Sequence, residues 1–168
     1  MKLFLIGYMG AGKTTLGKPL AQQLALPFID MDTVLEEREG KTITNLFEEL
    51  GESGFREKER DILRNGIFPD AFVMATGGGA PCFFDNMDWM NHKGVTMYLR
   101  AHPKEIARRL EHEREQRPLL RSIKKEDLEE VIGQRLAVRE KFYLQAQLVM
   151  ENNELTVEQL LEALQSYR

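Results

Sequence analysis

Short apolar runs alternate along this chain with longer segments of helical periodicity. The runs at residues 2–6, 27–30, 71–75, 94–99 and 147–150 have the length of buried parallel strands. Apolar side chains elsewhere recur every three or four residues, as at Leu16, Leu20 and Leu24. This alternation predicts an α/β fold in which helices cover both faces of a parallel sheet. The helices are predicted at residues 13–25, 33–39, 43–50, 53–65, 103–113, 125–144 and 156–166.

A glycine-rich turn follows the first apolar run. Residues 7–14, Gly-Tyr-Met-Gly-Ala-Gly-Lys-Thr, fit the P-loop pattern G-x-x-x-x-G-K-[ST]. Its glycines let successive backbone N–H groups face phosphate oxygens, and the next helix adds its N-terminal partial charge. Lys13 can reach the β- and γ-phosphates, and the Thr14 hydroxyl can bind Mg²⁺. The loop predicts a nucleoside triphosphate site, which occurs in kinases, GTPases, ATPases and nucleotide-binding regulators alike.

Ligands of open parallel sheets bind at the carboxyl ends of strands. Asp30 and Asp32 follow the second predicted strand and, because they alternate, point in different directions. One carboxylate can lie near Mg²⁺ while the other accepts the proton of an acceptor hydroxyl, as a kinase requires. The alternative is a strand end at which Asp32 caps a helix.

Two further patterns have both a structural and a functional interpretation. Arg56 and Glu59 lie three residues apart on one helix face. They form either a surface ion pair or an arginine that Glu59 holds for bidentate binding of a substrate carboxylate. Residues 77–79, three glycines after the third strand, indicate either a close approach of a ligand to the backbone or a tight turn.

Basic residues are concentrated between residues 100 and 125. Most of them form a solvated face, but the helical pattern breaks at Arg117-Pro118, which predicts a mobile, arginine-bearing lid between helices. Arg117 on this lid can cover the γ-phosphate, and Arg109 is the other basic residue of this segment that stands out as a candidate for a functional role. Farther along, Arg135 and Arg139 share a helix face, and spacing alone does not say which one reaches a pocket.

Composition excludes several classes of protein. The chain has 168 residues, enough for one domain, and its net charge of −4 argues against nucleic acid as the main partner. A single cysteine, Cys82, excludes an internal disulfide framework, and the three histidines are not clustered as metal ligands are. No run approaches the roughly 20 apolar residues of a membrane span. The start of the chain does not fit a signal peptide, because cleavage would remove the P-loop; we therefore expect a cytoplasmic protein.

In order and spacing, these motifs resemble those of shikimate kinases over essentially the whole chain. The implied fold is a three-layer P-loop kinase, like nucleoside monophosphate kinases, with five parallel strands in the order 2-3-1-4-5 and a mobile lid. The implied single domain spans residues 1–168, with the lid at about 112–124 and a shikimate-binding helical region at about 32–62. The matching segments are residues 7–17, Phe28-x-Asp30-x-Asp32, Phe55-Arg56-x-x-Glu59, Gly77-Gly78-Gly79 and Arg117-Pro118-Leu119-Leu120.

The resemblance implies that a monomer transfers the γ-phosphoryl group of ATP to the 3-hydroxyl of shikimate, on the route to chorismate and the aromatic amino acids. Lys13, Asp32 as base or orienter, and Arg117 would be catalytic, and Mg²⁺ would bind Thr14 directly and Asp30 through water. Arg109 resembles a residue that stacks on adenine. The implied ATP-binding residues are Gly10, Ala11, Gly12, Lys13, Thr14, Thr15, Arg109 and Arg117. The implied shikimate-binding residues are Asp32, Arg56, Gly77, Gly78, Gly79 and Arg139, with the carboxylate between the two arginines.

One segment departs from the family pattern Arg-x-Pro-x-Tyr. After Arg139 the chain has Lys141 in place of the proline and Leu144 in place of an acid, whereas Tyr143 keeps the register and favours Arg139 over Arg135. The adenine-binding loop, within residues 152–155, is left unassigned. The rival interpretations are a gluconate or nucleoside monophosphate kinase and a non-catalytic nucleotide sensor. A GTPase is disfavoured because the chain has no Asn-Lys-x-Asp segment.

Overall fold

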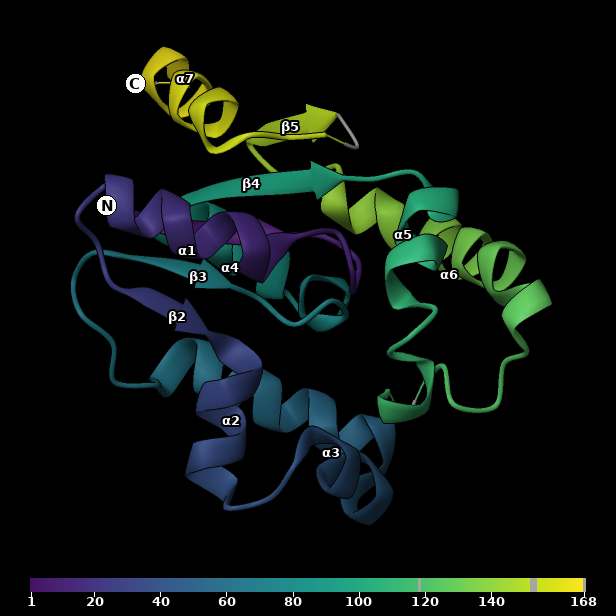
Figure 1. Ribbon diagram of the computed structural model, residues 1–168. Helices are drawn as coiled ribbons and strands as arrows, with labels where there is room; N and C mark the ends of the chain where they lie inside the picture. The colour runs from purple at the N-terminus through teal and green to yellow at the C-terminus, as the bar shows by residue number, and fades with distance from the viewer. Residues whose placement is uncertain (118, 152–153, 168) are drawn as a thin grey trace.

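Five parallel strands form one sheet in the order β2-β3-β1-β4-β5 (Figure 1). The computed structural model describes residues 1–117, 119–151 and 154–167, so Pro118 of the predicted lid and Asn152 and Asn153 of the predicted adenine segment lie outside the described residues. The observed order confirms the one that the motifs implied. The strands are β1 (Lys2–Ile6), β2 (Phe28–Asp30), β3 (Phe72–Ala75), β4 (Val95–Arg100) and β5 (Leu148–Glu151).

Helices cover both faces of the sheet and make a three-layer fold. Because neighbouring side chains of a strand point to opposite faces, β1 contributes to two cores. Leu5 packs in a core with Leu20 of α1 and Leu160 of α7, whereas Phe4 packs in the other core with Met90 of α4. The helices are α1 (Lys13–Gln23), α2 (Met31–Glu39), α3 (Ile43–Asn65), α4 (Asn86–Lys93), α5 (Pro103–Leu110), α6 (Leu128–Tyr143) and α7 (Val157–Tyr167).

Most predicted elements are present, and the larger differences concern α4, α5, α6 and α3. Helix α4 was not predicted, because its apolar side chains on an eight-residue helix are too few to set a period. Helix α5 ends at Leu110 rather than residue 113, and a short 3₁₀ turn precedes α6, which begins at residue 128 rather than 125. The helices predicted at 43–50 and 53–65 are both parts of α3, in which Gly51 (φ 69°, ψ 177°) marks a kink.

Two predicted helix starts are confirmed. The backbone N–H of Lys104 donates to Nδ1 of His102 (3.1 Å) at the start of α5, where Pro103 occupies the first turn. The Thr156 hydroxyl accepts from the backbone N–H of Gln159 (3.3 Å) at the start of α7.

The carboxyl ends of β1, β2 and β3 lie side by side, which brings the P-loop, the two aspartates and the three glycines to one edge of the sheet. Helices α2 and α3 extend beyond this edge, and the segment between α5 and α6 reaches toward α3 (Figure 1), where Nη1 of Arg121 lies 3.2 Å from Oε1 of Glu48. Among the described residues, no helix is both long enough and apolar enough to cross a membrane.

Candidate active site

Two adjoining cavities open at this edge of the sheet. The first, of about 540 Å³, follows the P-loop and α1, and the second, of about 430 Å³, lies between α2, α3 and the three glycines. They share Met9, Asp32, Gly78 and Arg117, so their contents would meet at these residues. The first is lined by the predicted ATP and metal residues Gly10, Ala11, Gly12, Lys13, Thr14, Thr15, Asp30, Arg109 and Arg117. The second is lined by the predicted acceptor residues Asp32, Arg56, Gly77, Gly78, Gly79 and Arg139.

The P-loop holds its lysine over the first cavity. Gly10 and Gly12 have left-handed φ values of 79° and 99°, which side chains rarely adopt. Nζ of Lys13 donates to the carbonyls of Gly7 (2.5 Å) and Tyr8 (3.0 Å). Burial lowers the pKa of Lys13 to about 8, against the attraction of Asp32. Among the described residues Lys13 donates to these two carbonyls, which it can exchange for phosphate oxygens.

Thr14 and Asp30 lie together at the base of the first cavity. The Thr14 hydroxyl donates to Oδ2 of Asp30 (3.1 Å), and Oδ1 of Asp30 accepts from the backbone N–H groups of Asp32 and Thr33. Asp30 therefore caps α2, and the alternative in which Asp32 is the cap is wrong. A hydroxyl beside a carboxylate fits Mg²⁺, which takes few protein ligands and keeps its waters. Among the described residues, no group of three or more His, Cys, Asp or Glu could hold a metal ion.

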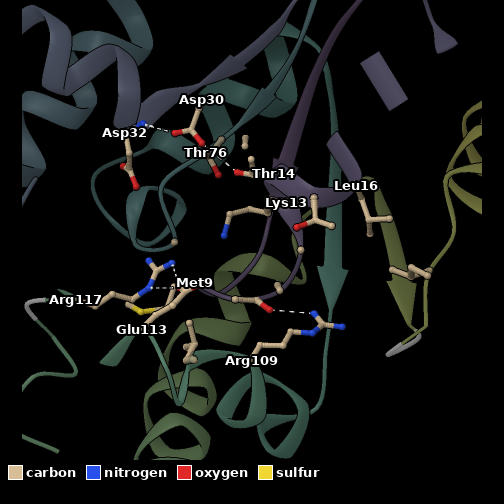
Figure 2. A pocket seen from close by; sticks show the side chains of 18 residues that line it. Met9, Lys13, Thr14, Leu16, Asp30, Asp32, Thr76, Arg109, Glu113 and Arg117 are labelled. Carbon is tan, nitrogen blue, oxygen red and sulfur yellow. Dashed lines mark hydrogen bonds and ion pairs between the residues drawn. The ribbon is translucent and has the colours of Figure 1, made fainter. Parts of the chain in front are cut away.

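The Asp32 side chain is left available by this capping arrangement. Figure 2 shows Asp32, Lys13 and Arg117 directed toward the same space. Burial and the neighbouring Asp30 carboxylate raise the pKa of Asp32, while Lys13 and Arg117 lower it. A half-buried carboxylate at the junction of the two cavities can accept a proton from a group in the second while facing phosphates in the first.

Arg56 and Glu59 form a buried ion pair at the back of the second cavity. Their residues are 4% and 1% exposed, so the alternative of a surface pair is wrong. Nη1 of Arg56 lies 2.6 Å from Oε1 of Glu59, and the guanidinium lies over the Phe83 ring, 4.5 Å from its centroid. Nε of Arg56 is buried and has no hydrogen-bond partner in the described part of the chain. The guanidinium is thus oriented, with donor capacity left for an anion.

The buried position of Glu59 predicts a pH-dependent stability. Burial raises the pKa of Glu59 from 4.5 to about 7, against the attraction of Arg56. The folded protein therefore binds more protons than the unfolded chain between these values, and this group lowers the free energy of unfolding as the pH rises through them. Residue 59 does not titrate in Glu59→Gln. Between about pH 5 and pH 8, the free energy of unfolding of the wild type should therefore fall by at most about 3 kcal/mol more than that of the variant. Urea unfolding of both proteins checks this, and parallel pH profiles would contradict it.

Close contacts explain the three consecutive glycines. A Cβ at Gly79 would overlap the guanidinium of Arg56, and one at Gly77 would overlap a carboxylate oxygen of Glu59. A Cβ at Gly78 would lie 3.1 Å from the backbone nitrogen of Met9. None of the three has a left-handed φ. The loop therefore needs glycine for the approach of its neighbours rather than for its own turn.

Gly79→Ala should raise the KM for the acceptor about tenfold and leave the KM for ATP almost unchanged, because the new methyl group displaces the Arg56 guanidinium. Steady-state kinetics with each substrate varied in turn measures both constants. Gly133→Ala is the matched control, since a Cβ in that part of α6 meets only Pro103, at 3.9 Å. Equal acceptor KM values in the two variants would disprove the steric argument.

The arginines of the second half of the chain have different partners. Arg139 lines the second cavity, whereas Nη1 of Arg135 donates to the Leu119 carbonyl. Of these two arginines, Arg139 is therefore the one that reaches the second cavity. Arg117 lies beside both cavities and pairs with Glu113 (2.7 Å). Nη1 of Arg109 donates to the carbonyl of Gly10 (3.0 Å), which places this side chain against the P-loop (Figure 2).

Sequence reasoning missed several residues that line the cavities. Phe47 and Phe55 form an apolar wall of the second cavity, with ring centroids 4.3 Å apart. They lie on either side of the Gly51 kink, so their spacing along the chain does not predict that the two rings meet. Met9 lies between the cavities at a variable position of the P-loop pattern. Leu155, at the end of the unassigned adenine segment, lines the first cavity.

Comparisons with known proteins agree with this geometry. The family model described as shikimate kinase matches residues 9–167. A shikimate kinase of Bacteroides thetaiotaomicron is 49% identical over 155 residues, which cover 92% of this chain and 89% of that relative. A crystal structure of shikimate kinase from Bacteroides thetaiotaomicron has a TM-score of 0.89 and 47% identity, covering 99% of this chain and 97% of that one. The shikimate kinase from Acinetobacter baumannii, solved in complex with shikimate, has a TM-score of 0.91 and 32% identity, covering 99% and 94%.

Proposed function

The chain belongs to the shikimate kinase family, and from this premise we propose that it transfers the γ-phosphoryl group of ATP to the 3-hydroxyl of shikimate. The products are 3-phosphoshikimate and ADP, and the reaction belongs to the shikimate pathway, on the route to chorismate and the aromatic amino acids. The observation that carries the proposal is the junction of the two cavities at Met9, Asp32, Gly78 and Arg117. A nucleotide in the first cavity and an acceptor in the second would react at this junction.

The second cavity suits a small hydroxylated acid. Arg56 and Arg139 clamp the carboxylate of shikimate, and Asp32 binds the ring hydroxyls from the side of the phosphates. This clamp holds the 3-hydroxyl in line with the γ-phosphorus, and such positioning contributes several kcal/mol to catalysis. Asp32 accepts the hydroxyl proton as the oxygen attacks.

Lys13 and Arg117 supply positive charge at the transferring phosphoryl group. Lys13 exchanges its bonds to the Gly7 and Tyr8 carbonyls for phosphate oxygens. Arg117 belongs to the lid at about residues 112–124, where its pair with Glu113 holds it beside both cavities. Closure of the lid over the helical region at about residues 32–62 brings Arg117 to the γ-phosphate and excludes water, so that ATP is not simply hydrolysed.

Mg²⁺ is part of the proposal because Thr14 and Asp30 fit it. Thr14 would hold the ion through its hydroxyl and Asp30 through a water molecule. When bound, Mg²⁺ neutralises charge on the phosphates of ATP.

One chain lines both cavities, which supports a monomer as the working unit. We place that monomer in the cytoplasm, where ATP is produced and used.

A coupled assay of ADP release tests the proposal directly. The protein is incubated with ATP and Mg²⁺ and with shikimate, gluconate, AMP or no acceptor, and shikimate alone should stimulate release, with about 1–100 turnovers per second. Chelation of Mg²⁺ with EDTA should abolish the release. Stimulation by another acceptor would overturn the substrate assignment, and ATP binding without any acceptor-dependent release would indicate a nucleotide sensor.

A further inference from the structure

An aromatic ring of the phosphate loop, rather than a carboxylate, lies against Arg139. We propose that Tyr8 is a positioning residue for Arg139 and that it physically joins the phosphate-binding loop to the site of the acceptor carboxylate. The inference rests on the proposed function, since it takes Arg139 as a ligand of that carboxylate. It adds a role for Tyr8, a side chain at a variable position of the P-loop pattern.

The two arginines of the second cavity are oriented in different ways. Arg56 pairs with Glu59 at 2.6 Å, whereas Arg139 makes no ion pair with a carboxylate of the described chain. The guanidinium carbon of Arg139 instead lies 5.3 Å from the centroid of the Tyr8 ring. Nη1 of Arg139 is buried and lacks a hydrogen-bond partner among the residues that the structure describes. The aromatic face of Tyr8 therefore holds this cation from the side of the phosphate loop, and the Tyr143 hydroxyl interacts with it from its own helix.

The buried side chain of Tyr8 acts here through its ring. Tyr8 is 1% exposed, and its hydroxyl, like Nη1 of Arg139, finds no hydrogen-bond partner within the described ranges. A ring attracts a cation through the negative charge of its face without accepting its N–H groups. A carboxylate in the same place would compete with the incoming acceptor for Arg139. An aromatic support orients the guanidinium and leaves its charge and donors for the substrate.

The main chain of Tyr8 belongs to the nucleotide side of the site. Its carbonyl accepts from Nζ of Lys13 (3.0 Å) and from the backbone N–H of Ala11 (3.1 Å). One residue thus contacts both the lysine that would bind phosphate and the arginine that would bind the acceptor carboxylate. On the helix that carries Arg139, the Tyr143 hydroxyl donates to the Gly78 carbonyl and braces α6 against the glycine loop.

The test separates the ring from the hydroxyl. Tyr8→Leu should raise the KM for shikimate about fivefold or more and change the KM for ATP by less than about twofold, whereas Tyr8→Phe should keep both within about twofold of the wild type. Phe4→Leu is the matched control, because Phe4 is equally buried, packs on Phe72 and Trp89 and lines neither cavity. An equal rise of the shikimate KM in Phe4→Leu, or in Tyr8→Phe, would overturn the inference.

A double-mutant cycle shows whether Tyr8 acts through Arg139. In an Arg139→Ala background, Tyr8→Leu should change the shikimate KM by less than about twofold, because the group that it positions is gone. An unchanged KM in Arg139→Ala alone would overturn the role of Arg139 in the proposed function. A raised KM in Arg139→Ala with an unchanged KM in Tyr8→Leu would overturn the positioning role alone.

A further variant keeps the test valid if Tyr8→Leu does not fold. Pentafluorophenylalanine at position 8 preserves the shape of the ring and reverses the charge distribution of its face. The shikimate KM should rise about fivefold relative to Tyr8→Phe, with thermal unfolding unchanged within a few degrees. Equal shikimate KM values for the fluorinated and unfluorinated rings would refute an electrostatic contact.

Discussion

Replacing Asp32 with asparagine is expected to lower kcat by about 100-fold or more while ATP still binds. Asp32 lies at the junction of the two cavities, where it faces Lys13 and Arg117, and asparagine cannot accept the acceptor proton. Its backbone N–H would still donate to Asp30, so α2 keeps its cap. Steady-state ADP release with both substrates saturating measures kcat, and calorimetry measures ATP binding.

Asp61→Asn is the matched control for this variant. Asp61 pairs with Arg38 away from both cavities, with 40% of its side chain exposed, and its substitution should leave kcat unchanged. A kcat for Asp32→Asn within about threefold of the wild type would show that Asp32 is not the base.

Burial raises the pKa of Asp32, so this carboxylate takes up a proton at a higher pH than an ordinary aspartate does. As the pH is lowered, the wild-type kcat should therefore begin to fall at a higher pH than an ordinary aspartate base would give.

Arg56→Ala is expected to raise the shikimate KM about tenfold or more and to leave the ATP KM nearly unchanged. The substitution removes one arm of the proposed carboxylate clamp and does not touch the first cavity. It also leaves Glu59 buried without its partner, which costs about 3–5 kcal/mol of stability in comparable buried pairs. Kinetics must therefore be read together with thermal unfolding.

The double variant Arg56→Ala/Glu59→Gln separates binding from stability. Glutamine removes the unpaired buried charge, so the double variant should regain most of the lost stability while the shikimate KM stays high. Arg56→Lys keeps the charge but loses the planar fork, and an intermediate KM is expected. A folded Arg56→Ala protein with the wild-type shikimate KM would exclude Arg56 from the clamp.

The features predicted best from the sequence are those that depend only on residues close together in the chain. The P-loop from Gly7 to Thr14 is contiguous, and its glycines, lysine and threonine act through a local backbone turn, so its place at the first cavity could be read directly. The strand order followed from the resemblance. Helix α4, by contrast, has eight residues and was missed, because its formation depends on packing Met87 and Met90 against the sheet rather than on a visible period.

Tertiary structure decided between alternatives that local spacing leaves equal. The three-residue spacing of Arg56 and Glu59 puts them on one helix face, but only the packing of α3 against the glycine loop buries them. Arg135 and Arg139 share a face of α6, and the Leu119 carbonyl, contributed by the segment between α5 and α6, engages Arg135. Burial and long-range partners depend on which segments meet, and spacing along one helix does not contain that information.

The sequence by itself determined that this chain has a phosphate-binding loop and two carboxylates and a glycine run at the ends of its strands. The sheet order β2-β3-β1-β4-β5 then places the ends of β1, β2 and β3 side by side, and the chain closes two cavities around Asp32. A motif such as the P-loop depends on the backbone conformation of a few neighbouring residues. The meeting of distant residues around the cavities depends instead on how the whole fold buries its apolar surface. That is why the contact between Tyr8 and Arg139, 131 residues apart, could be found only in the structure.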